Sequence, residues 1–500
     1  MNLTKSQVVI FTIISITGAF MAVMDTTIVD IVVPKLTGVL ATDMYGVQWI
    51  ITAYMLSAAV SLLISPFLIH NFGKHKVFLF GLSVFTLASF MCGVSNSLEF
   101  MVFSRVIQGF GEALVMVTAH IMIFSYFPPE KKGIAMGIFA LGVAFAPAIG
   151  PTLGGYLVEY FNWRMVFFVN VPIGIVVVIS GIFLLTKDKT TKMSLDIYSL
   201  TFLSISTLTL LILLSKGQQY GWFNSDYILW LGFISLISFL AFIYVEIGSK
   251  NKLIEYKLFK NKDFTLGILI YFVILGFSMY QYFYLLPVFY EHIKGLPSLY
   301  AGIGIFGFGI FIGIFSILAG IISDKHSPKI VILIGVLIYL IDTLYFIPKI
   351  NYYTPFFQAV LYTVPLGIAM GMFFAPVTVL VMNAAPKHNE QATMIMDYVR
   401  FVGGSFGTAI ATNNLEFFKN EQFLKINENQ SYWYIKDFID KLTPNIDLSK
   451  AIFGNYEMLM SGNYGFYNVF IDASFYGIIG SVFVFLLFVK KLNFGIMTKK

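Results

Sequence analysis

Cysteines and charged residues are scarce in this sequence. The only cysteine among the 500 residues is Cys92, so neither a disulfide framework nor a cysteine metal cluster can be built. Charged residues make up 12% of the positions and hydrophobic residues 58%, whereas roughly a quarter of an ordinary globular protein is charged. A water-soluble fold cannot bury that much apolar surface. The sequence also lacks a G-x-x-x-x-G-K-[ST] phosphate loop, so an ATP-driven pump would need a second subunit.

The apolar residues fall into blocks of about 20, the length that a helix needs to cross the hydrocarbon core of a membrane. These blocks predict an all-α polytopic membrane protein. The segment that begins near Val8 is interpreted as a retained first span, because no cleavage site follows a short apolar core. The fourteen predicted spans are 8–34, 47–69, 77–95, 99–124, 134–158, 164–186, 195–215, 227–247, 264–289, 300–322, 329–348, 354–383, 392–416 and 466–489.

The lysines predict the orientation, since short cytoplasmic loops accumulate Lys and Arg. Twenty lysines fall on the side that holds both ends, whereas the short loops of the other side hold only Lys35, Lys216, Lys294 and Lys349. We therefore expect an inner-membrane protein with both termini in the cytoplasm. This distribution explains the net charge of +6 without a nucleic-acid partner. The polar segment at about 417–465 is predicted to form a small extracytoplasmic cap or docking surface.

A two-helix unit is repeated along the chain. Pro34 is predicted to end the first span, and 36 residues later His70 lies in a basic turn; Pro287 is predicted to end the ninth span, and 37 residues later Asp324 lies in another basic turn. Duplicated halves around a central site are typical of secondary transporters. The predicted domains are a six-helix half at 1–190, two inserted helices and a cytoplasmic linker at 191–262, and a second six-helix half at 263–500.

Glycine and proline are concentrated in one predicted span, in the run GVAFAPAIGPTLGG at 142–155. This run resembles the antiporter signature in the fifth helix of efflux members of the major facilitator superfamily. Its signature residues are Gly142, Pro147, Gly150, Pro151, Gly154 and Gly155. Runs beginning at Met24, Arg105, Asn162 and Arg400 are similar to other motifs of the fourteen-span drug:proton antiporters, the EmrB/QacA type.

The resemblance implies proton-coupled efflux of lipophilic, cationic small molecules by alternating access, in a non-enzyme that uses the proton gradient and no cofactor. It also implies a periplasmic adaptor and an outer-membrane channel as candidate partners, beside small-molecule substrate, protons and lipid. The cytoplasmic gating turns of the family correspond to Gly73, Lys74, Gly320 and Asp324, but His70 stands where the family has an acid. An exporter of a metabolite, siderophore or amino acid remains an alternative. A membrane enzyme or a channel is less favoured.

Ionisable residues inside spans mark a transport pathway or a paired structural contact. Those assigned to proton coupling and substrate binding are Asp25, Asp30, Arg105, Glu112, Asp397 and Arg400, and the family usually has Asn at the positions of Asp30 and Asp397 and a small residue at that of Glu112. Asp342 and Asp472 also lie within spans. Asp25 is favoured over Asp30, because the two lie about 140° apart around an ideal helix.

Spacing makes three further suggestions about these spans. Gly109 shares a helix stripe with Arg105 and Glu112, and is expected to leave room for substrate. Asp397 and Arg400 are three residues apart and can pair, whereas His120 stands alone in the fourth span and is not expected to bind a metal. The small residues of 142–155 predict either a tight helix crossing or close packing against a helix of the other half.

Overall fold

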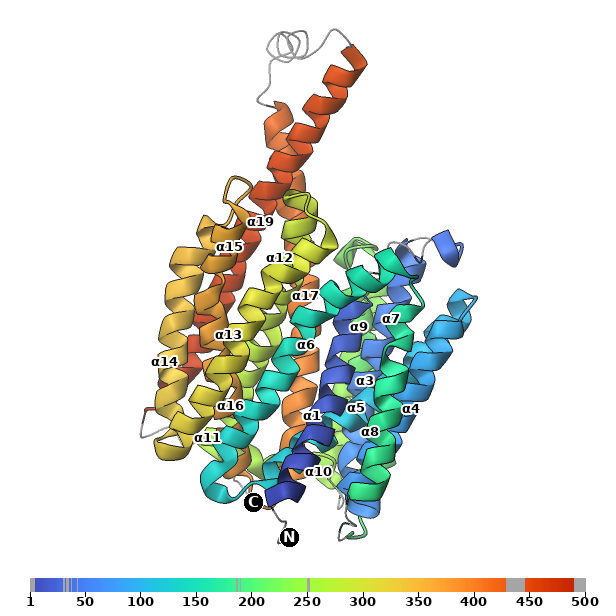
Figure 1. Cartoon of the computed structure of the whole chain (residues 1–500), viewed down its shortest axis with the longest axis vertical. Coiled ribbons are helices and arrows are strands. Elements are labelled where there is room, and N and C mark those ends of the chain that lie inside the picture. The colour runs from blue at the N-terminus through green and yellow to red at the C-terminus, as the bar shows by residue number, and fades with distance from the viewer. Residues whose placement is uncertain are drawn as a thin grey trace.

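The computed structural model describes residues 5–29, 32, 36, 38–42, 44–185, 188, 190–249, 252–428 and 446–489. Within these ranges all regular elements are helices, which confirms the all-α prediction, and a helix lies at each predicted span (Figure 1). Pro34, the predicted end of the first span, lies outside the described residues. Twelve helices in this described part are long and apolar enough to cross a membrane. Helices α6 (Lys132–Tyr160) and α17 (Asn389–Glu428) occupy the other two predicted positions.

The helices form two bundles with a pair of helices beside them (Figure 1). We call the bundle formed by residues 5–184 the N bundle and the bundle formed by residues 262–486 the C bundle. The N bundle contains α1 (Lys5–Ile28), α3 (Met44–Phe72), α4 (Lys74–Val94), α5 (Leu98–Tyr126), α6, α7 (Met165–Phe168) and α8 (Asn170–Leu184). The C bundle contains α11 (Lys262–Ile270), η4 (Tyr271–Ser278), α12 (Met279–Val288), η5 (Phe289–Ile293), α13 (Ser298–Lys325), α14 (Pro328–Ile341), η6 (Asp342–Phe346), α15 (Phe356–Tyr362), α16 (Val364–Ala384), α17 and α19 (Ile446–Leu486).

The helix pair between the bundles in sequence consists of α9 (Ile197–Lys216) and α10 (Asp226–Gly248), which pack against each other. Helix α9 also packs on α3 and α17. The Thr207 hydroxyl lies 2.5 Å from the hydroxyl of Tyr398, and the Trp222 indole N–H donates to Asn413 Oδ1 at 2.9 Å. The inserted pair therefore lies along the line where α3 of one bundle meets α17 of the other.

Local chemistry determines several helix starts. Helix α4 follows Gly73, whose φ of 88° is a conformation that residues with a Cβ seldom adopt. Helix α5 follows Ser97, whose hydroxyl accepts from the N–H of Phe100, and α9 follows Asp196, which accepts from two N–H groups of the first turn. Large apolar side chains cover the outside of the bundles, as a lipid environment requires; examples are Phe183, Trp230 and Tyr244, which are 81%, 63% and 83% exposed.

Two predictions about span ends are wrong. Pro287 lies inside α12, and the helix continues through the π-helical turn η5 to Ile293; a membrane helix tolerates proline because its neighbours restore the lost backbone bonds. The last two spans are longer than predicted, since α17 continues to Glu428 and α19 begins at Ile446. Much of the predicted 417–465 cap is therefore a packed pair of helices that projects beyond the other helices (Figure 1).

Both ends of the described chain lie at one face of the molecule, opposite this projection (Figure 1). We call it the terminal face. Helices α5, α13 and α16 end there, and α4, α6, α11 and α17 begin there.

Candidate functional site

A cavity of about 130 Å³ lies between the two bundles. Its wall is apolar and aromatic, and Arg400 is its one charged lining residue in the described part of the chain. The lining residues are Val23, Thr26, Thr27, Met55, Ala140, Val143, Met279, Tyr280, Phe283, Tyr284, Ile312, Met370, Phe374, Arg400 and Thr408. Flexible methionines and aromatic rings suit apolar ligands of varied shape, because they fill irregular gaps without fixed hydrogen bonds.

A smaller cavity of about 40 Å³ adjoins the first and shares six of its lining residues, among them Tyr280 and Arg400. It adds the carboxyl group of Glu112, whose Oε2 is buried without a hydrogen-bond partner. Arg400 donates to the Tyr280 hydroxyl at 3.0 Å. The two cavities together therefore present one acid and one guanidinium group to a ligand in otherwise apolar surroundings.

Asp25 and Arg105 form a buried ion pair, at 0% and 1% exposure, and neither lines the two cavities. Asp25 also accepts from the side-chain amides of Gln108 at 2.9 Å and Asn170 at 2.8 Å. The Arg105 guanidinium lies over the Tyr54 ring, 3.9 Å from its centroid. This network joins α1, α3, α5 and α8 inside the N bundle. The structure thus brings two predicted site residues together, but away from the cavity wall.

Gly109 does not leave room for a ligand, contrary to the expectation from its spacing. A Cβ at this position would meet the backbone carbonyl of Tyr54, so the space is filled by the main chain of α3. The glycine lets α5 approach α3 closely, and Glu112 one turn further on is the acid that reaches the cavity. Asp30 lies outside the described residues.

Asp397 and Arg400 lie together, as their spacing suggested. Arg400 Nε is 3.8 Å from Asp397 Oδ1, and both side chains are buried. His120 is not alone: its Nδ1 lies 3.7 Å from Asp397 Oδ2, which sequence reasoning missed. The carboxyl group of Asp342 is fully buried and has no hydrogen-bond partner, whereas Asp472 accepts from Asn414 at 2.9 Å.

Two glycines of the 142–155 motif, Gly142 and Gly150, face α1 of the same bundle. A Cβ at Gly142 would meet Ile16, and one at Gly150 would meet Thr27. The motif also contacts α13 of the C bundle, where Thr152 lies against Gly302 and Phe145 against Gly313. Both packing arrangements suggested by the sequence therefore occur, on two sides of α6. Pro147 and Pro151 lie within α6, and Gly154 is buried and Gly155 half-buried in it.

The closest approach of α6 to α13 lies at the terminal face, ahead of this motif. A Cβ at Gly133 would meet the Gly320 carbonyl, and a Cβ at Gly320 would meet the Gly133 carbonyl. The Asp324 carboxylate accepts from the N–H groups of Gly133 at 2.6 Å and Ile134 at 2.9 Å. It therefore caps the start of α6 and binds the two bundles together, because a helix N-terminus attracts a negative charge.

The corresponding turn of the N bundle obtains its carboxylate from elsewhere. Asp188, in the segment after α8, accepts from the N–H of His75 at 2.8 Å and lies 3.2 Å from the ring Nδ1 of the same residue. Lys74 donates to the Ser125 hydroxyl. His70, which replaces the family's acid, lies 2.9 Å from Thr191 and 3.9 Å from Glu390 of the C bundle. The acid missing from the turn is thus supplied by a residue more than 100 positions later.

We expect Asp324→Asn to lower the free energy of unfolding by about 1–2 kcal/mol, because an amide is a weaker cap than a carboxylate and lacks its charge. Thermal unfolding in detergent measures the effect. Asp263→Asn is the matched control, since Asp263 pairs with Lys329 at 2.7 Å on the surface, where ion pairs contribute little. Equal stability of the two variants would contradict the capping role of Asp324.

Comparison with known proteins agrees with this architecture. Residues 16–408 match the family model described as Major Facilitator Superfamily. The chain belongs to the major facilitator superfamily. Its fold is also similar to that of the proton:xylose symporter XylE, with a TM-score of 0.61 at 14% identity and coverage of 97% of this chain and 96% of the other.

The curated relatives of this major facilitator protein include multidrug exporters, which supports the resemblance seen in the sequence. The multidrug export protein EmrB of Escherichia coli K12 is 29% identical over 422 residues, covering 82% of this chain and 80% of EmrB. The riboflavin transporter RibZ of Clostridioides difficile is 30% identical over 442 residues, covering 86% of this chain and 94% of RibZ. The chain is therefore a multi-span membrane transporter of small molecules.

Proposed function

We propose that this protein exports lipophilic, cationic small molecules in exchange for protons, by alternating access across the inner membrane, with both termini in the cytoplasm. The observation that carries the proposal is the apolar, methionine-rich and aromatic cavity between the bundles, with Glu112 and Arg400 as its charged groups. The relationship to EmrB, a multidrug export protein, supports the same class of substrate.

Glu112 is the acid that a cation and a proton compete for. Glu112 lines the smaller cavity and its Oε2 has no hydrogen-bond partner, so a bound cation gains an ion pair with this carboxylate, and a proton removes that partner. Each proton that enters across about 100 mV releases roughly 2.3 kcal/mol. At about 1.4 kcal/mol per tenfold change, one proton per substrate sustains a gradient of about fortyfold.

The Glu112→Gln substitution tests this role. In energised inverted vesicles, we expect it to reduce proton-driven transport of a cationic dye at least about tenfold, while transport of an uncharged lipophilic dye declines less, because only the cation uses the carboxylate. Glu99→Gln is the matched control, since Glu99 lies on the same helix and is exposed.

Two results would overturn the proposal in different ways. Equal transport of the cation by Glu112→Gln and Glu99→Gln would remove Glu112 from the coupling role. Absence of transport by the wild-type protein for cationic, uncharged and anionic dyes alike would reject multidrug export itself.

A second candidate function is export of one flat, polycyclic metabolite. The observation that favours it is the relationship to RibZ, a riboflavin transporter, over almost the whole of that protein. The aromatic wall formed by Tyr280, Phe283 and Phe374 is compatible with stacking on such a ring system. Transport of riboflavin in the same vesicles, with no transport of unrelated dyes, would favour this alternative.

The projecting ends of α17 and α19 are the proposed contact surface for a periplasmic adaptor. They extend beyond the other helices on the face opposite the termini (Figure 1). An adaptor and an outer-membrane channel would carry the substrate onward after its release on that side. Co-purification of tagged adaptor with full-length protein, and its loss when the projecting ends are shortened, would support this contact.

A further inference from the structure

A histidine and an aspartate meet across the two bundles, outside the cavities described above. His120 lies on α5 of the N bundle and Asp397 on α17 of the C bundle, with Nδ1 and Oδ2 3.7 Å apart. Their exposed fractions are 0% and 2%. Both ring nitrogens of His120 and Asp397 Oδ2 are buried without a hydrogen-bond partner. Two titratable groups are thus held near one another in a site that water does not reach in this conformation.

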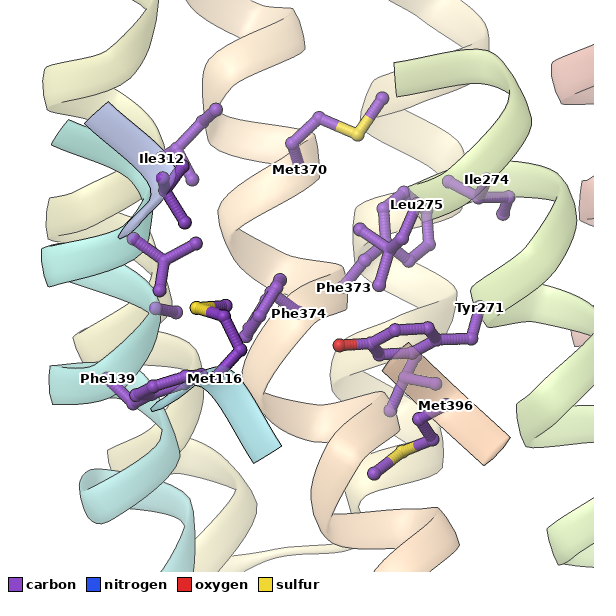
Figure 2. Packing of buried hydrophobic residues seen from close by; sticks show 14 of the residues in the cluster. Met116, Phe139, Tyr271, Ile274, Leu275, Ile312, Met370, Phe373, Phe374 and Met396 are labelled. Atoms are coloured by element: carbon purple, nitrogen blue, oxygen red, sulfur yellow. The ribbon is translucent and has the colours of Figure 1, made fainter. Parts of the chain in front are cut away.

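The surroundings of the pair are apolar. The Phe139 ring of α6 stacks on the His120 ring with centroids 4.8 Å apart, and Phe374 of α16 lies 6.3 Å beyond Phe139. Figure 2 shows Met116 and Phe139 of the N bundle opposite Phe374, Tyr271 and Met396 of the C bundle. Charges in such a layer interact more strongly than in water, and an unpaired charge there is costly.

The pair lies between the two cavities described above and the terminal face. His120 is six residues from the end of α5 at Tyr126, and Asp397 is eight residues from the start of α17 at Asn389. Both helix ends are at the terminal face, whereas Glu112 and Arg400 lie further along the same two helices and line the smaller cavity. Separation of the bundles at the terminal face would therefore separate this pair.

Few other charges face the pair in the described part of the chain. Arg400 Nε lies 3.8 Å from Asp397 Oδ1, Glu112 is two helical turns from His120, and η4 contributes the neutral hydroxyl of Tyr271. The ionisable groups of the other helices packed on α5 are engaged elsewhere: Asp25 of α1 with Arg105, His70 of α3 near Glu390, His75 of α4 with Asp188, Lys74 of α4 with Ser125, and Lys132 of α6 over the Phe124 ring.

We propose that His120 and Asp397 together bind one proton when the bundles are closed at the cytoplasmic face, and release it into the cytoplasm when they open. The inference rests on the proposed function for its direction, since it assigns the terminal face to the cytoplasm. With the proton bound, an imidazolium ring and a carboxylate neutralise each other. Without it, His120 is neutral, and the remaining charged neighbour of Asp397 is Arg400 at 3.8 Å on the same helix, so the attraction between α5 and α17 is lost and opening becomes favourable. Proton affinity is thereby tied to conformation, as coupling requires.

Distance measurements between two spin labels test the proposal. Lys76 of the N bundle and Lys387 of the C bundle are exposed at the terminal face and accept labels after replacement by cysteine, whereas the native Cys92 is buried. In the purified full-length protein, we expect the short distance to dominate at low pH and a longer distance to gain population as the pH rises.

Variants separate a titrating pair from a structural contact. His120→Gln keeps a polar side chain that does not titrate, and Asp397→Asn removes the charge from the other side; each should abolish the pH-dependent transition or shift it by at least about one pH unit. The exchanged variant His120→Asp/Asp397→His restores the pair in reverse and should restore the transition. His70→Gln is the control, since His70 is the other histidine that approaches the opposite bundle in the described chain, and it should leave the midpoint unchanged.

The proposal is overturned if His120→Gln titrates like the wild type, or if His70→Gln alone removes the transition. If one single variant does not fold, the other still tests the pair from the opposite helix. Its failure differs from failure of the proposed function. A wild-type protein that shows the pH-dependent transition but transports no dye would support the proton site and reject multidrug export. A protein that exports dyes but shows no transition would support multidrug export and reject the proton site.

Discussion

Asp25→Asn will destabilise the folded protein by about 3–5 kcal/mol, although Asp25 does not line the cavity. The substitution leaves the Arg105 guanidinium buried at 1% exposure without its counter-ion. The amides of Gln108 and Asn170, which donate to the carboxylate, also lose part of their electrostatic attraction. Breaking one partner of a buried pair costs more than the pair contributes, because the remaining charge stays desolvated.

The double variant Asp25→Asn/Arg105→Gln is the informative comparison. It removes both charges, so we expect it to be more stable than either single variant. Cys92 provides the measurement, because its buried Sγ lies 3.5 Å from Gln108 Oε1 and becomes reactive toward a thiol-specific dye when this region unfolds. Asp263→Asn breaks a surface ion pair and is the control; it should lower the free energy of unfolding by no more than about 1 kcal/mol.

A transport measurement on the Asp25→Asn variant distinguishes a structural role of Asp25 from the coupling role predicted from sequence. With equal amounts of folded protein in the vesicles, we expect Asp25→Asn to transport dye more like the wild type than Glu112→Gln does, since only Glu112 reaches the cavity. A fully stable Asp25→Asn protein that has lost proton coupling would contradict this expectation and favour direct coupling by Asp25.

The all-helical, multi-span fold was predictable from sequence because the thickness of the hydrocarbon imposes a length on each apolar block. The prediction failed where this constraint does not apply. Helices α17 and α19 continue through polar residues outside the apolar blocks, where helix packing determines their length. Pro287 was misread as a span end, since a proline that breaks a soluble helix is tolerated between packed membrane helices.

The candidate site was only partly predictable. Charged residues inside spans stand out because burial is costly, so the sequence pointed to the buried charges of Asp25, Arg105, Glu112, Asp397 and Arg400, of which Glu112 and Arg400 line the cavities. Their partners are neutral or distant in sequence and carry no such signal. Gln108 and Asn170 resemble ordinary helix residues, and Asp188 lies in a loop. The proximity of His120 to Asp397 depends on how two bundles dock, which local spacing does not encode.

Gly320→Leu will have the second large effect, because no side chain fits where α6 and α13 touch. A Cβ at Gly320 would meet the carbonyl of Gly133, and backbone cannot turn aside as a side chain can. Overpacking of this kind costs typically about 1–3 kcal/mol when the structure adapts. The protein can relieve this clash by separating the two bundles, which would also move Asp324 away from the start of α6.

We therefore expect Gly320→Leu to populate the longer distance between labels at Lys76 and Lys387 at every pH, and to reduce dye export at least about tenfold, since closure at the terminal face is lost. Gly454→Leu is the matched control: a Cβ there meets nothing within 4 Å, and the change in helix propensity is the same. If Gly320→Leu kept the short distance at low pH, the Gly133–Gly320 contact would not hold the bundles together. Closure would then depend on the Asp324 cap and the His120–Asp397 pair.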